Sequence, residues 1–122
     1  MISIVEDDAA VRAATENLVK ALGFDVYTFA SAVEFLQSHR VPETVCLISD
    51  VQMPNMSGVE LQANLADRGF RIPTIFMTAF PDESVKRRAM YAGAVGFLPK
   101  PFNAKALIQC IRDAISQGGG KA

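Results

Sequence analysis

Residue types suited to phosphoryl chemistry occur at four separate places along this chain of 122 residues. Glu6 and Asp7 follow one apolar run, Asp50 follows a second, and Thr78 and Lys100 follow two more. Carboxylates that converge repel one another unless a cation neutralises them, and such hard oxygen ligands suit Mg²⁺. A carboxylate nucleophile, a metal, a further cation and a positioned hydroxyl are together what phosphoryl transfer to an aspartate requires.

These side chains can meet only if the apolar runs before them are strands of one sheet. Five short β-branched runs alternate with stretches of helical period, which predicts βα units and a parallel sheet. The first, third and fourth runs are typical of strands that are covered on both faces. The expected strands are 2–5, 25–28, 45–49, 74–77 and 95–98.

Few topologies suit five parallel strands whose crossovers are right-handed. We expect an α/β fold of the flavodoxin-like (βα)5 kind, a doubly wound five-stranded parallel sheet in the order 2-1-3-4-5. Ligands in such folds lie beyond the carboxyl ends of the strands, which is where the residues named above fall.

Five helices are expected between and after the strands. Gly23 ends the first helix, and the fourth has a thin apolar stripe, whereas the fifth has a strong one. The glycines 118–120 should not continue the fifth helix, so residues 118–122 are expected to be a flexible tail or the stub of a linker. Side chains suited to cap the second, third and fourth helices are Ser31, Ser57 and Asp82.

Composition excludes several classes of function. The 12 basic and 13 acidic residues nearly cancel, and no dense basic patch predicts direct nucleic acid binding by this chain. No apolar run approaches the roughly 20 residues that cross a bilayer, and no secretory signal is apparent, so we expect no membrane association and a cytoplasmic location. Cys46 and Cys110 lack metal-ligand spacing and are expected to be unreactive thiols. His39 is expected at the surface.

Four motifs, in this order, resemble those of CheY-like receiver domains of two-component response regulators. The resemblance covers essentially the whole chain, and it is the combination of the four that is specific, because each alone is common. The motifs are Ile-Val-Glu-Asp-Asp at 4–8, Asp-Val-Gln-Met-Pro at 50–54 with Gly58, Met-Thr-Ala at 77–79 and Lys-Pro-Phe at 100–102.

The resemblance implies a metal site and a phosphoacceptor. Asp50 would accept the phosphoryl group and, with Asp7, bind Mg²⁺ or Mn²⁺ directly. Glu6 would contribute to the metal through water, and the backbone carbonyl of Gln52 would be the third protein ligand.

The resemblance also implies a switch. Thr78 would move to hydrogen-bond the phosphoryl oxygens, and Lys100 would pair with the carboxylate or the phosphoryl group. The bond between Lys100 and Pro101 would be cis, which is costly except before proline. Phe97 would turn inward with Thr78 and remodel the surface of the fourth helix, fifth strand and fifth helix, although an aromatic in a strand can equally be plain core.

The implied function is that of a receiver domain, residues 1–117, in two-component signal transduction. A sensor histidine kinase or histidine phosphotransfer protein would supply the phosphoryl group, and the protein would be a switch, not an enzyme, catalysing only its own phosphorylation and dephosphorylation. An effector domain or separate target protein would be the downstream partner. The sequence leaves open a phosphorylation-dependent homodimer, and whether the receiver stands alone or belongs to a longer transcription factor.

Two alternatives compete with this interpretation. Hydrolases of the haloacid-dehalogenase type also use a strand-end aspartate, Mg²⁺ and a lysine, but they need an acid two places after the nucleophile, where this chain has Gln52. A degenerate receiver that binds partners without phosphorylation would not need the acids, Thr78 and Lys100. One departure from common receiver patterns is Phe80, whose ring is hypothesised to shield the acyl phosphate and lengthen its life.

Overall fold

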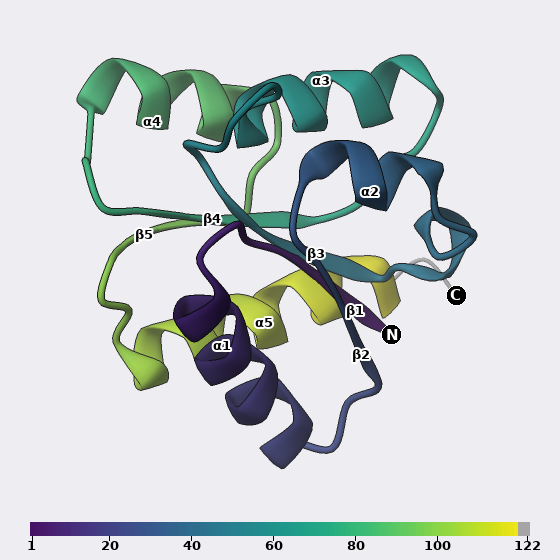
Figure 1. The fold of residues 1–122 in the computed structure, drawn as a ribbon, viewed down its shortest axis with the longest axis vertical. Coiled ribbons are helices and arrows are strands. Elements are labelled where there is room, and N and C mark those ends of the chain that lie inside the picture. The colour runs from purple at the N-terminus through teal and green to yellow at the C-terminus, as the bar shows by residue number, and fades with distance from the viewer. Residues whose placement is uncertain (120–122) are drawn as a thin grey trace.

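Five parallel strands form one sheet in the computed structural model, which describes residues 1–119 (Figure 1). The strands are β1 (Ile2–Val5), β2 (Val26–Phe29), β3 (Cys46–Asp50), β4 (Thr74–Thr78) and β5 (Gly96–Pro99). The helices are α1 (Ala9–Ala21), α2 (Ala32–Gln37), α3 (Gly58–Asp67), α4 (Glu83–Tyr91) and α5 (Ala104–Gly119), and a 3₁₀ turn spans Val41–Glu43. Within these residues no helix combines the length and apolar character that crossing a bilayer would take.

The strand order is β2-β1-β3-β4-β5, and every neighbouring pair is parallel. The predicted flavodoxin-like fold is therefore confirmed. The main difference from the predicted strands is at their carboxyl ends, because β2, β3, β4 and β5 each end one residue later than predicted. Asp50 pairs with Met77 in the β3–β4 ladder, so Asp50 and Thr78 are the last residues of their strands instead of the first residues after them.

Helices cover both faces of the sheet, with α1 and α5 on one side and α2, α3 and α4 on the other (Figure 1). Alternate residues of a strand point to opposite faces, and β3 follows this rule. Cys46 and Ile48 pack in the cluster beneath α1 and α5, whereas Leu47 packs with Leu61 and Leu65 of α3. Because β1, β3 and β4 are buried along their whole length, the polar residues at their ends are held by rigid elements.

Polar side chains start the helices that follow the functional strands. Asp8 accepts hydrogen bonds from the backbone N–H groups of Ala10 and Val11 at the start of α1. Ser57 forms a capping box with Glu60 at the start of α3, and Asp82 caps α4. Asp8 thus provides the hydrogen-bond acceptor for backbone N–H groups at the start of α1, and Glu6 and Asp7 are not needed as caps.

The predicted end of the fifth helix is wrong. The helix was expected to stop before Gly118, but α5 continues through Gly119. Glycine in a helix costs only about 1 kcal/mol per residue relative to alanine, which the preceding turns of α5 can offset. The other residues assigned to a tail or linker, 120–122, lie outside the described part of the chain.

Gly58 is where the fold has no room for a side chain. A Cβ at this position would lie 2.2 Å from the Asp50 carbonyl oxygen, which is backbone, and 2.9 Å from the Phe76 ring. We predict that Gly58→Ala lowers the free energy of unfolding by about 1–3 kcal/mol, the usual cost of overpacking, in urea denaturation followed by circular dichroism.

Gly96→Ala is the matched control, because its Cβ would meet the side chain of Cys110, 2.6 Å from the sulfur. That side chain can change rotamer, so this variant should lose about 1 kcal/mol or less. Equal losses in the two variants would contradict the assignment of a backbone clash at Gly58.

Candidate functional site

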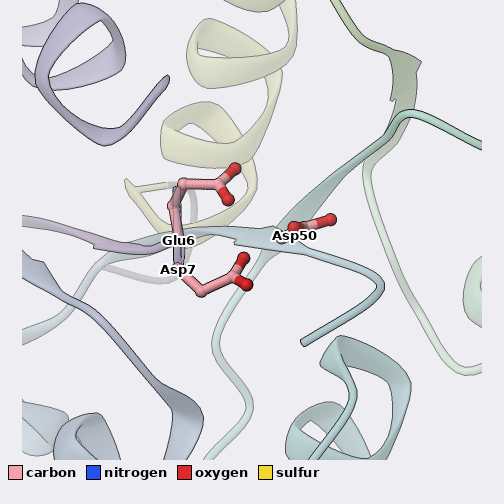
Figure 2. Close-up of side chains that lie close together, drawn as sticks. All are labelled: Glu6, Asp7 and Asp50. Atoms are coloured by element: carbon pink, nitrogen blue, oxygen red, sulfur yellow. The ribbon is translucent and has the colours of Figure 1, made fainter. Parts of the chain in front are cut away.

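Three carboxylates meet at the carboxyl edge of the sheet. Glu6 and Asp7 lie just past β1, and Asp50 ends the neighbouring strand β3. One oxygen from each of the three lies within 4.8 Å of the others, and Figure 2 shows the three side chains close together. Glu6 and Asp50 are buried, whereas Asp7 is exposed, so an ion held here would keep access to solvent.

Lys100 joins the group from the loop after β5. Its Nζ lies 2.7 Å from Glu6 Oε1 and 3.0 Å from Asp50 Oδ2, and the lysine side chain is 14% exposed. The contact with Asp50 is also a hydrogen bond, whereas the contact with Glu6 Oε1 is close in distance but lacks hydrogen-bond geometry. The backbone N–H of Lys100 donates to the Thr78 carbonyl, which fixes the loop against the end of β4. The Lys100–Pro101 bond is cis, the isomer that the resemblance led us to expect.

Glu6 is the carboxyl group most altered by its surroundings. Burial raises the pKa of Glu6 from 4.5 to about 7, and the charge of Asp50 adds to this. The close contact with the Lys100 ammonium and the hydrogen bond from the Asp8 N–H only partly oppose the increase. A single lysine therefore does not fully stabilise the negative charge at this edge.

The residue types fit a hard divalent cation. Clustered carboxylates with an open, solvent-facing side are the donor set that Mg²⁺ uses in proteins. A pKa of about 7 for a buried glutamate indicates a site that favours either a proton or additional positive charge. Glu6, Asp7 and Asp50 could hold such an ion together with backbone from the loop after β3.

That loop begins at Val51 and positions Asp50. The backbone N–H of Gln52 donates to Asp50 Oδ1 over 3.2 Å, and Gly58 N–H donates to the Val51 carbonyl. Asn55 has a φ of 72°, a left-handed conformation that asparagine tolerates well. Gln52 is thus next to Asp50 in space as well as in sequence.

Thr78 and Phe97 lie on the neighbouring strands β4 and β5. Thr78 is buried, and its Oγ1 accepts a hydrogen bond from Phe80 N–H at 3.0 Å. Among residues 1–119 no hydrogen bond joins Thr78 to Asp50. Phe97 is half-buried, with its ring centroid 6.4 Å from that of Phe76. The structure thus brings Glu6, Asp7, Asp50 and Lys100 into contact, with Thr78 one strand away.

Two features of the site were missed by sequence reasoning. Lys100 bridges two carboxylates, Glu6 and Asp50, at once, and no linear pattern indicates that pairing. Arg12 of α1 also reaches the site, because its Nη1 donates to the Glu6 carbonyl oxygen over 2.8 Å. The available signal was an arginine in the second turn of a helix that directly follows an acidic loop.

Comparison with known proteins agrees with this geometry. The family described as response regulator receiver domain matches residues 2–112. The response regulator protein TmoT of Ectopseudomonas mendocina is 42% identical over 94% of this chain, and nodulation protein W of Bradyrhizobium diazoefficiens is 40% identical over 91%. These alignments cover 52% and 49% of the two relatives, so the chain spans about half the length of the curated relatives that it matches.

Solved structures show the same likeness. The response regulator StyR superposes with a TM-score of 0.90 at 43% identity, over 98% of this chain and 61% of that one. FixJ-N superposes with a TM-score of 0.83 at 38% identity, over 94% of this chain and 92% of that one.

The fold and the acidic edge thus define a protein of the two-component signalling class. The chain belongs to the response regulator receiver domain family. Receiver domains of this family are in general switches that bind Mg²⁺, not enzymes acting on outside substrates.

The raised pKa of Glu6 gives a pH-dependent prediction for metal-free protein. Between pH 4.5 and 7 the folded state keeps a proton on Glu6 that the unfolded state has released, so the Glu6 contribution to the free energy of unfolding falls as pH rises. Lys100 stays charged in both states over this range. The unfolding free energy of Glu6→Gln minus that of the wild type should therefore grow between pH 5 and pH 8, by on the order of 2 kcal/mol.

Urea denaturation with a chelator present, at several pH values, measures this difference. Glu16→Gln, which removes a carboxylate of α1 that lies outside the acidic cluster and pairs with Lys20, is the matched control. A difference that stays flat or shrinks with pH for Glu6→Gln would contradict the raised pKa.

Proposed function

We propose that the protein is a phosphorylation-controlled switch that accepts a phosphoryl group on Asp50. One observation carries the proposal, namely that one oxygen from each of Glu6, Asp7 and Asp50 lies within 4.8 Å of the others while Lys100 contacts two of these residues. A carboxylate nucleophile beside a cation and a metal-binding acid pair is the arrangement that phosphoryl transfer needs.

Each site residue has a separate role in the phosphoryl transfer. An Asp50 carboxylate oxygen attacks phosphorus, the bond between phosphorus and the donor nitrogen breaks, and the departing imidazole takes up a proton. Lys100, already 3.0 Å from Asp50 Oδ2, stabilises charge on the new acyl phosphate. Mg²⁺, held by Asp7, Asp50, the Gln52 carbonyl and, through water, Glu6, would neutralise the phosphoryl oxygens.

The phosphodonor in this proposal is a sensor histidine kinase or a histidine phosphotransfer protein. Family membership supports this, because receivers act in two-component signalling. The relatives TmoT and nodulation protein W are about twice as long as the matched region. We therefore propose that residues 1–117 form the receiver and that the chain controls either an output domain joined after it or a separate target. We propose a cytoplasmic location and no direct nucleic acid contact by this chain.

The output surface in this proposal consists of α4, β5 and α5. Thr78 would move toward the phosphoryl group, and Phe97 would turn into the space that it vacates. Ala89 is the only fully buried residue of α4, which makes this helix easy to displace. Met90 and Tyr91, at the end of α4, are 42% and 96% exposed and offer apolar contact area to a partner or to a second copy of the chain.

Treatment with acetyl phosphate tests the acceptor directly. With Mg²⁺ present, intact mass should increase by one phosphoryl group, and a chelator should prevent this. Asp50→Asn should abolish the gain, because an amide cannot form the acyl phosphate, whereas Asp67→Asn on the exposed face of α3 should behave as the wild type. Phosphorylation of Asp50→Asn, or none of the wild type, would contradict the proposal.

Phe80 is proposed to set the lifetime of the acyl phosphate. It follows Thr78 by two places, its N–H donates to Thr78 Oγ1, and the residue is 70% exposed. We predict that Phe80→Glu, which admits and orients water, speeds dephosphorylation several-fold. Loss of the phosphoryl group after removal of the donor, followed by intact mass, measures the rate.

Phe80→Leu is the control for this prediction, because it keeps an apolar side chain and should stay close to the wild-type rate. An unchanged or slower rate in Phe80→Glu would reject the shielding role.

A further inference from the structure

We propose that Arg12 is a positioning residue for the divalent cation, acting by holding the loop that presents Asp7. The inference rests on the proposed function, since it concerns the same metal site. It assigns a role to a residue of α1 that does not itself ligate the metal.

The contact that carries the inference is between a side chain and the main chain. Arg12 is half-buried in the second turn of α1, and its Nη1 donates to the Glu6 carbonyl oxygen over 2.8 Å. That carbonyl belongs to the peptide unit joining Glu6 to Asp7. Because a peptide unit is planar, fixing its carbonyl also fixes the direction in which the chain enters Asp7.

Asp7 depends on such support, because its own side chain has no hydrogen bond or ion pair within residues 1–119. The last main-chain hydrogen bond from this segment to the sheet is donated by the Glu6 N–H to the Phe29 carbonyl over 3.0 Å, so the chain at Asp7 no longer belongs to the sheet. On one side, the Asp8 N–H donates to Glu6 Oε2 over 3.1 Å. On the other side, the Arg12 guanidinium holds the Glu6 carbonyl. The position of the Asp7 carboxylate thus depends on contacts made by its neighbours Glu6 and Asp8, and among them the Arg12 contact acts directly on the peptide unit that joins Glu6 to Asp7.

The charge of Arg12 and its hydrogen bond act on a cation with opposite signs. A guanidinium near the acids repels Mg²⁺, so removing the charge alone would tighten binding. A guanidinium that orients the ligand loop favours Mg²⁺, so removing the hydrogen bond would weaken binding. Residues that orient metal ligands typically change affinity by about 10–100-fold when mutated, whereas a solvent-screened charge does less. The orienting effect should therefore outweigh the charge repulsion, so that removing the Arg12 side chain weakens Mg²⁺ binding.

The experiment is a MgCl₂ titration of ¹⁵N-labelled protein without phosphodonor, followed by the amide resonances of Asp7 and Asp8. Arg12→Gln removes both charge and hydrogen bond and should weaken Mg²⁺ binding by about tenfold. Arg12→Lys keeps the charge and one donor group, so its Mg²⁺ affinity should lie between that of the wild type and that of Arg12→Gln. Lys20→Gln, which removes a positive charge from the exposed far end of α1, should bind as the wild type does.

A second readout separates positioning from general stability. In metal-free protein, hydrogen exchange of the Asp8 amide should speed up in Arg12→Gln, while exchange in β3 stays unchanged. Wild-type affinity or tighter binding in Arg12→Gln, or an equal loss in Lys20→Gln, would overturn the inference and leave the proposed function intact. Absence of Mg²⁺ binding by the wild type would instead overturn both. If Arg12→Gln does not fold, wild-type affinity in Arg12→Lys together with unchanged Asp8 exchange would overturn the inference.

Discussion

Electrostatic crowding at one edge of the sheet is the constraint on which the site depends. Two carboxylate oxygens within 4.8 Å of each other repel by about 3 kcal/mol or more at an effective dielectric constant of about 20, and a carboxylate and an ammonium 3 Å apart attract by about 5–6 kcal/mol. Lys100 makes two such contacts, with Glu6 and Asp50, and no ion pair within residues 1–119 involves Asp7. The raised pKa of Glu6 is the visible result of this incomplete compensation.

The sheet sustains the crowding because the acids lie at the ends of its most buried strands. Every residue of β1 and β3 is buried, and the apolar side chains pack in clusters on both faces. A flexible loop would relieve the repulsion by moving its carboxylates apart, but backbone anchored in this way cannot. The hydrophobic core therefore contributes to the function by preventing the charges from separating.

Sequence patterns were sufficient for the fold, because hydrophobic period and βα alternation are local signals. They predicted all five strands, the sheet order and the convergence of Glu6, Asp7, Asp50 and Lys100 at one edge. What they missed depends on tertiary geometry or on small energies. The double ion pair of Lys100 needs three strand ends in register. The continuation of α5 by two residues through Gly119 depends on an energy difference of about 1 kcal/mol per glycine.

The way α4 is attached explains how a change at Asp50 could be enough to move a distant surface. A phosphoryl group shifts a two-state equilibrium only by its differential interaction with the states, so the gap between them must be small. Ala89 alone is fully buried on α4, and Gln62 of α3 holds its carbonyl through a hydrogen bond as long as 3.3 Å. The Gln62 Oε1 is itself buried without a partner among the described residues, so the Gln62 side chain contributes little to holding α4 against α3. A helix held this weakly requires little free energy to reposition, and under the proposed function the added charge at Asp50, sensed through Thr78, provides it.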